Sequence, residues 1–162
     1  MKKTIAGLSA VFALATASYA QSSANLTIQG SVSAINTISV APQTGYNALD
    51  LVNGETDKLV GIATETSNDV LGYKVTLKST NAGTSAQAVL KGAASGNADT
   101  VNYSVKYGGS VVTLSSGAAV VTSASGRTGS SGATKNISIT LAGGWRTADT
   151  YSDTLTLTIV GN

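Results

Sequence analysis

Apolar and polar residues alternate along much of the chain. Four stretches show the alternation most clearly, residues 73–78, 101–107, 137–141 and 155–159. Tyr, Val, Ile or Leu fills every second position there, and Lys, Ser, Thr or Asn fills the positions between. Because successive side chains of a strand point to opposite faces, each stretch predicts a half-buried antiparallel strand. Weaker patterns predict further strands at residues 49–52, 59–65, 88–90, 111–114 and 119–121.

Turn-forming residues separate these stretches. Gly108-Gly109 lies between two apolar runs and predicts a two-residue hairpin, and the Ser/Gly-rich residues 123–134 predict a flexible, solvated loop. No helix is predicted after residue 20. Many short strands at this spacing are typical of a β-sandwich or a β-barrel, and the pattern by itself does not separate the two.

The first twenty residues have the organisation of a secretory signal peptide. Lys2 and Lys3 precede an apolar stretch at residues 5–17, and Ser18-Tyr19-Ala20 offers small residues for cleavage after Ala20. The apolar stretch is shorter than the roughly 20 residues that a membrane-spanning helix needs. We therefore expect a mature chain of residues 21–162, secreted and without a membrane span.

The mature chain begins with another alternating segment. Its apolar or small residues on one face are Ala24, Leu26, Ile28, Gly30, Val32 and Ala34. The pattern predicts a strand, which is either the first strand of the same domain or a strand that pairs with a neighbouring molecule. Periodicity does not choose between these alternatives.

Charge and composition exclude several classes of function. Cleavage removes two of the ten basic residues and leaves eight to balance eight acidic ones. A net charge of zero tolerates self-association and fits poorly with binding to nucleic acid or anionic lipid. The chain has no His and no Cys, which removes the usual nucleophile–base pairs, thiolate sites and disulfides. We expect no enzyme activity, no cofactor and no metal.

Several residues that could form a metal, catalytic or sugar-binding site are better explained by structural roles. Residues 50–57 contain acidic side chains, but their spacing does not match a calcium loop, and Asn53-Gly54 predicts a turn there. Glu65 and Asp69 are expected as solvated loop residues rather than as a catalytic carboxylate pair. Trp145 is expected to be partly buried in the core rather than to stack on a sugar.

Together, these features resemble those of a chaperone–usher pilin, which is the major subunit of a fimbria. The resemblance is to a cysteine-free branch of these pilins or to a spore-coat-U-like relative. Residues 25–32 (NLTIQGSV), directly after the signal peptide, carry part of the resemblance, and the closing residues 149–159 (DTYSDTLTLTI) carry another part. The third part is the size and the Ser/Thr/Gly-rich all-β character of the mature chain. Many pilins have one disulfide, whereas this chain has no Cys.

The resemblance implies an immunoglobulin-like antiparallel sandwich that lacks one strand and is completed by the extension of the next subunit. Residues 21–34 would be the extension and residues 35–162 the domain. The implied donor-strand residues are Leu26, Ile28, Gly30 and Val32. The implied edge of the acceptor groove consists of Tyr151, Leu155, Leu157 and Ile159. A periplasmic chaperone and an outer-membrane usher would be partners, together with further copies of the chain.

We therefore expect a structural subunit of a bacterial surface filament, which polymerises by donor-strand exchange and supports adhesion or biofilm formation. The alternative is a monomeric secreted sandwich that binds carbohydrate. It predicts that residues 22–34 pair within their own domain and that Trp145 is exposed beside a concave face. A small secreted enzyme is the poorest of the three hypotheses, because His is absent and carboxylates are few.

Overall fold

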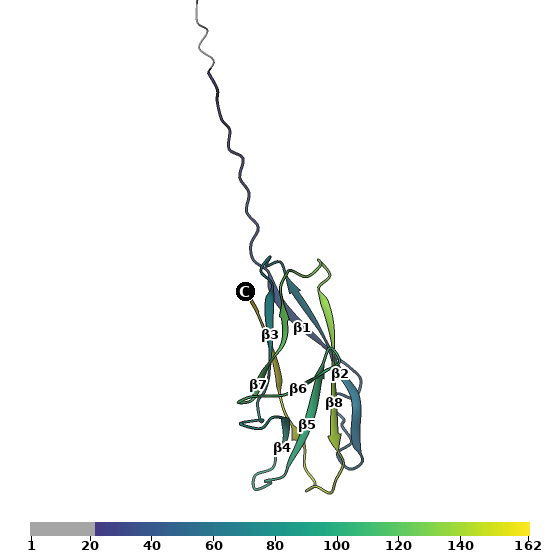
Figure 1. The fold of residues 1–162 in the computed structure, drawn as a ribbon. Coiled ribbons are helices and arrows are strands. Elements are labelled where there is room, and N and C mark those ends of the chain that lie inside the picture. Colours follow the sequence, from purple (N-terminus) through teal and green to yellow (C-terminus); the bar gives the residue numbers. More distant parts are fainter. Residues whose placement is uncertain (1–21) are drawn as a thin grey trace, which may run out of the picture. The chain divides into compact units, whose positions relative to one another are not determined.

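The four strands that the clearest alternation predicts are present in a computed structural model that describes residues 22–162. The predicted signal peptide, residues 1–20, lies outside the described residues. A compact unit runs from Ser33 to Asn162. Its regular structure is entirely β, every strand pair in the described part is antiparallel, and two sheets are formed (Figure 1). The all-β prediction is confirmed.

In the larger sheet the strands follow the order β1 (Asn36–Pro42), β2 (Gly54–Ser67), β8 (Ala133–Ala142), β5 (Thr100–Tyr107), β4 (Ala88–Gly92) and β9 (Tyr151–Ser152). A seventh strand, β6 (Ser110–Val112), pairs with β5. The smaller sheet has the order β10 (Leu155–Gly161), β3 (Tyr73–Ser79) and β7 (Ala118–Ala124). β3 therefore lies between the C-terminal strand and β7.

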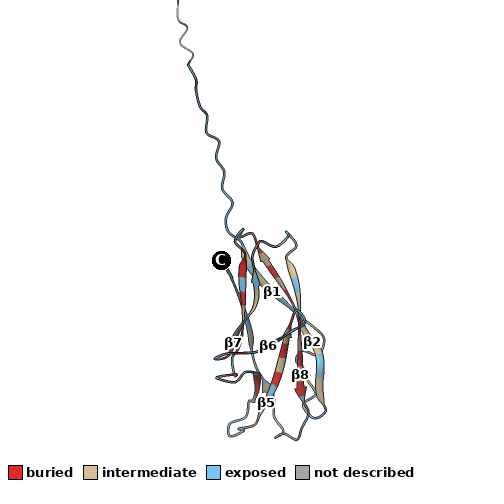
Figure 2. Ribbon diagram, viewed as in Figure 1, coloured by how far each residue is buried: buried red, intermediate tan, exposed pale blue. Residues whose placement is uncertain are grey.

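The core lies between the two sheets. The apolar faces of β3, β5 and β8 are buried, and their polar faces are partly or fully exposed. Figure 2 shows these buried residues along the strands. Val75 and Leu77 of β3 have no exposed surface, and Tyr103 and Tyr107 of β5 are buried as well. The period-2 alternation thus identifies the inward faces correctly.

Two local predictions have different outcomes. The hairpin at Gly108-Gly109 is confirmed, since it joins β5 to β6 with both residues at positive φ, 57° and 87°. The strand predicted at residues 49–52 is wrong. Asp50 Oδ1 there accepts hydrogen bonds from the backbone N–H groups of Val52 and Asn53, at 3.0 and 2.8 Å, and holds the segment in a turn.

Both ends of the domain differ from the sequence prediction. β1 was not predicted, because Ile38 and Val40 are its only large aliphatic residues and the more regular alternation precedes it. Residues 22–35 contain no strand. The closing segment is not one strand. β9 pairs with β4 in the larger sheet and β10 pairs with β3 in the smaller one, and the chain changes sheets at residues 153–154.

Glu65 is a further correction, since its exposed fraction is 0% and it lies on β2 instead of in a solvated loop. Its Oε1 accepts hydrogen bonds from Tyr107 Oη and Thr122 Oγ1, both at 2.7 Å, and its Oε2 accepts one from Tyr73 Oη at 2.9 Å. Glu65 and Tyr107 belong to the larger sheet, whereas Tyr73 and Thr122 belong to the smaller one. The carboxylate therefore joins the two sheets through the core.

Candidate functional site: an apolar groove between two edge strands

Each sheet ends in a strand with one unpaired side. Among the described strands, β1 pairs with β2 alone and β10 pairs with β3 alone. β1 and β10 nevertheless lie near each other. An unpaired strand edge presents free backbone N–H and C=O groups that a further strand can use. The two edges therefore border the same gap in the domain.

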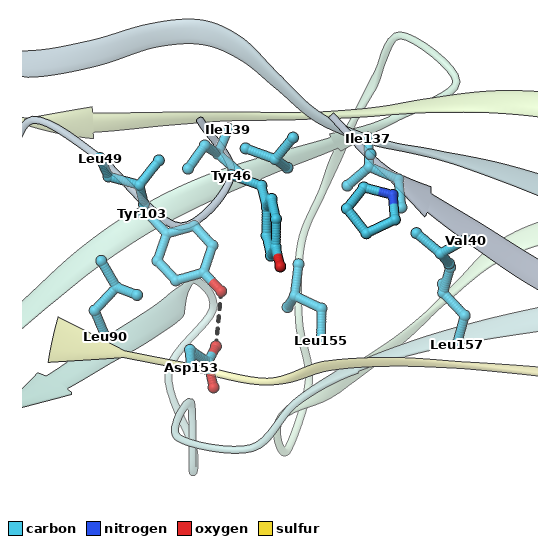
Figure 3. Close-up of a pocket in the computed structure, with 13 residues that line it drawn as sticks. Val40, Tyr46, Leu49, Leu90, Tyr103, Ile137, Ile139, Asp153, Leu155 and Leu157 are labelled. Atoms are coloured by element: carbon cyan, nitrogen blue, oxygen red, sulfur yellow. Dashed lines mark hydrogen bonds between the residues drawn. The ribbon is translucent and has the colours of Figure 1, made fainter. Parts of the chain in front are cut away.

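An apolar groove of about 240 Å³ occupies this gap. Its walls come from both sheets and from the loop between β1 and β2 (Figure 3). The lining residues are Val40, Pro42, Tyr46, Leu49, Val60, Gly61, Leu90, Tyr103, Ile137, Ile139, Asp153, Leu155 and Leu157. Two of the residues that the resemblance assigns to the groove edge, Leu155 and Leu157, are among them.

The groove leaves part of the core uncovered. Leu155 and Leu157 of β10 face inward but are only half-buried, whereas their partners across the strand pair, Ser79 and Leu77 of β3, are buried. The two leucines pack against the core on one side and contribute to the groove wall on the other. Burying an exposed aliphatic side chain is favourable by about 1.5–3 kcal/mol. The groove is therefore a place where additional apolar side chains gain stability.

The groove does not reach the end of β10. Near the start of β1 and the end of β10, the Asn36 side chain lies against Gly161, and a Cβ at Gly161 would come within 2.8 Å of Asn36 Nδ2. Ile159 belongs to this end. It is half-buried but does not line the groove, which extends along Leu155 and Leu157 instead.

The opposite end of the groove is open. An adjoining cavity of about 450 Å³ shares Tyr46, Leu49, Leu90 and Asp153 with the groove and continues past Tyr151. Tyr151, the fourth residue assigned to the groove edge, therefore lines this extension. The groove and the cavity together form a continuous depression that widens away from Gly161.

Tyr46 divides this depression. The residue lies in the loop between β1 and β2, which is held by a hydrogen bond from Tyr46 N to Gln43 O at 3.1 Å. Figure 3 shows its ring extending into the groove between Tyr103 and Leu155. About half of the side chain remains exposed. A strand that fills the groove has to pack against this ring or displace it.

Asp153 provides the polar group at the open end. It accepts hydrogen bonds from Tyr103 Oη at 2.7 Å, from Ser79 Oγ at 2.6 Å and from Asn81 N at 3.1 Å. Burial of the Tyr103 ring, together with its hydrogen bond to Asp153, raises the pKa of this tyrosine. Like Glu65, Asp153 connects the sheets, because Tyr103 belongs to the larger one and Ser79 to the smaller one.

The residues that the resemblance assigns to the donor strand lie in the N-terminal segment. Leu26, Ile28 and Val32 are 86%, 88% and 87% exposed. Gly30 lies between them in open space, with no atom within 4 Å of an added Cβ. A row of three large aliphatic residues in water is unfavourable unless another surface covers it.

Other candidate chemistry finds local explanations. Glu55 forms an ion pair with Lys58, and Asp57 forms one with Lys106, each at 2.6 Å. In residues 22–162 no three acidic, His or Cys side chains are grouped as metal ligands would be. The expected burial of Trp145 is wrong, since the side chain is 94% exposed in the loop between β8 and β9. Small flanking residues, Gly143 and Gly144, give this loop no apolar surface to cover the ring.

Comparison with models of protein families finds no match for the chain, and comparison with curated protein sequences finds none either. Within the described residues, no helix is long and apolar enough to cross a membrane. Most groove residues were not identified from the sequence. They come from six strands and the intervening loops, and only the inward-facing pattern of each strand gives a local signal for them.

Proposed function

We propose that this protein is a structural subunit of a surface filament and that it polymerises when the N-terminal segment of one copy fills the groove of another. The observation that carries the proposal is the apolar groove between the unpaired edges of β1 and β10. The same chain supplies a segment of matching character, with Leu26, Ile28 and Val32 alternating and exposed. Groove and segment together provide both halves of a strand-addition contact.

The energetics favour such a contact. Burial of three aliphatic side chains contributes on the order of 1.5–3 kcal/mol each. Each new backbone hydrogen bond to β1 or β10 adds roughly 1 kcal/mol. The total is comparable with the stability of a whole domain, about 5–15 kcal/mol. Because the donor and the acceptor are different surfaces, the contact is heterologous and generates a filament or a ring instead of a closed dimer.

Secretion and assembly follow from the resemblance described above. A pilin-like subunit would cross the inner membrane with its signal peptide, bind a periplasmic chaperone, and reach the bacterial cell surface through an outer-membrane usher. The filament would support adhesion or biofilm formation. The protein would act without catalysis, cofactor or metal.

A denaturing gel of protein sheared from the native host tests the proposal. Unboiled samples should give a ladder of multimers, and boiled samples should give one band near the mass of the mature chain. No disulfide can account for such a ladder, since the chain has no Cys. A single monomer band in both lanes would contradict polymerisation.

Variants in the N-terminal segment sharpen the test. Ile28→Asp places a charge on the alternating apolar face, whereas Gln29→Asp places the same charge on the opposite face and serves as a matched control. We expect Ile28→Asp to abolish the ladder and Gln29→Asp to preserve it. Both residues lie outside the compact unit, so neither substitution changes its core. Equal ladders from the two variants would exclude the segment as the donor.

Carbohydrate binding is the second candidate, and one observation favours it. Trp145 is almost fully exposed, as a sugar-stacking platform requires. The other requirement of that hypothesis, pairing of residues 22–34 within their own domain, is not met, since no strand forms there. Retention of the wild-type protein, but not of Trp145→Ala, on immobilised polysaccharides would support it.

A further inference from the structure

Exposed apolar residues occur at both ends of the domain. At the end where β1 begins, Val70 and Leu71 of the loop between β2 and β3 are exposed, and Ile35 beside them donates its N–H to Asn68 Oδ1 at 2.7 Å. At the other end, Val52 and Trp145 are exposed. Their loops lie side by side, since Gly144 N donates to Leu51 O at 3.0 Å. Neither pair of residues has a role in the groove.

The groove determines which end faces the next subunit. A donor segment is continuous at its C-terminal end with a complete domain, so that end must leave through an opening. The groove ends before the place where Asn36 lies against Gly161, and it continues into the adjoining cavity near Asp153. The donor therefore emerges at the open end, running antiparallel to β10 and parallel to β1, since β1 begins where β10 ends.

The connection between donor and domain is short. Val32 is the last large apolar residue of the segment, and β1 begins at Asn36. Asn36 lies four residues after Val32, so at most about 13–14 Å separates their Cα atoms, at roughly 3.3–3.6 Å per residue. The next domain must consequently sit against the open end of the groove, with the start of its β1 nearest to it.

These constraints place the Trp145 end of one subunit next to the Val70 end of the following subunit. Leu51, which is hydrogen-bonded to the Trp145 loop, lines the cavity at the open end, so Trp145 and Val52 lie close to where the donor emerges. Val70 and Leu71 lie beside the first residues of the following domain. We infer that Trp145 and Val52 of one subunit pack against Val70 and Leu71 of the next, as a second, head-to-tail contact of the filament. The inference rests on the proposed strand exchange and adds to it.

The fluorescence of the wild-type protein provides the first test, because Trp145 is the only tryptophan of the chain. In the monomer the exposed indole should emit at the long wavelength typical of a ring in water. On assembly the emission maximum should shift to shorter wavelength and quenching by iodide should weaken severalfold. Filaments, identified by electron microscopy, whose emission and quenching equal those of the monomer would overturn the inference and leave strand exchange intact.

Cysteine pairs provide the second test, and the chain has no native Cys to interfere. Leu71→Cys combined with Trp145→Cys should give a ladder that survives boiling and collapses with reductant, because a disulfide requires the two Cα atoms to be about 4.4–6.8 Å apart. Val70→Cys with Val52→Cys repeats the test at neighbouring positions. Leu71→Cys with Val111→Cys is the matched control, since Val111 is exposed on β6 at the flank of the domain, and should give no such ladder.

The outcomes separate the two proposals. A wild-type unboiled ladder with neither cross-linked ladder overturns the end-to-end contact alone. Dimers formed by Leu71→Cys by itself would show that like ends meet, and would overturn both the contact and the antiparallel donor. Absence of any wild-type multimer overturns strand exchange itself.

Discussion

Replacement of Glu65 is the sharpest test of how this domain is held together. The carboxylate has no exposed surface and accepts three hydroxyl hydrogen bonds, from Tyr73, Tyr107 and Thr122. Glu65→Ala removes the acceptor for all three hydroxyls at once. Glu65→Gln keeps the shape of the side chain and one oxygen, and replaces the other oxygen by an amide.

The structure sets the size of each effect. A buried donor left without a partner costs about 1–3 kcal/mol, so the Tyr73 and Tyr107 hydroxyls together cost about 2–6 kcal/mol in Glu65→Ala, and the half-buried Thr122 hydroxyl adds less. In Glu65→Gln the amide oxygen can take the position of Oε1 and keep the bonds from Tyr107 and Thr122. The amide N–H then donates to the Tyr73 hydroxyl, which accepts instead. Charge assistance is lost and the buried Tyr73 O–H is left without its acceptor, while burial of an uncharged group offsets part of the loss, so we expect about 1–3 kcal/mol, less than for Glu65→Ala.

Urea denaturation followed by far-ultraviolet circular dichroism measures these differences. An Ile28→Asp background keeps the protein monomeric under the proposed mechanism. Tryptophan fluorescence is unsuitable, because Trp145 is exposed already in the folded domain. Glu55→Ala is the matched control, since Glu55 pairs with Lys58 and accepts the Asp50 N–H outside the core, and its midpoint should fall by much less than that of Glu65→Ala. A Glu65→Ala midpoint equal to that of the parent, or equal damage by Ala and Gln, would refute the reasoning.

Three further predictions concern other parts of the domain. Burial and the hydrogen bond to Glu65 raise the pKa of Tyr73 to about 12. The stability that this tyrosine contributes is therefore complete below its unfolded pKa near 10 and declines as the pH rises from about 10 to about 12. Tyr73→Phe should flatten this decline, measured as urea midpoints across that pH range. Gly72→Ala should lower the melting temperature by several degrees, because φ is 92° and the new Cβ meets the Ala124 carbonyl. Gly83→Ala is the control, since φ there is 57° and the added Cβ meets open space, and it should lower the melting temperature less. Equal melting temperatures of the two variants would contradict this prediction. Tyr46→Ala should speed the uptake of a peptide of residues 22–34 in a gel-shift time course, and an unchanged rate would show that the ring does not impede the donor.

The sequence predicted most of the fold because strand alternation is a local signal. Residues 101–107 and 137–141 bury every second side chain as expected. β1 was missed because its alternation is short and follows a longer, cleaner one that forms no strand in the domain. Under the proposed strand exchange, clean alternation and the lack of a strand in the same domain are expected together. The apolar face of such a segment is matched to another molecule, so its pattern contains no information on its own domain.

The groove and the buried carboxylates were beyond local prediction. Glu65 follows an alternating run, and only the fold brings Tyr107 and Thr122, 42 and 57 residues away, to its oxygens. The groove likewise combines side chains as distant as Val40 and Leu157. Leu155 and Leu157 were identifiable because the alternation of β10 is regular, but their half-buried state depends on β10 pairing with β3 alone among the described strands.

The Glu65 and Asp153 carboxylates help to explain how a sandwich without a disulfide keeps a groove open. An incomplete core tends to collapse until its apolar walls meet. Glu65 and Asp153 resist that collapse, because each joins the larger sheet to the smaller one through hydroxyl hydrogen bonds of 2.6–2.9 Å, and such bonds fix the separation of the sheets. Glu65 lies toward the end where β1 begins, and Asp153 lies at the open end of the groove. With one connection at each end, the walls between them stay apart and the groove stays open, as the proposed strand exchange requires.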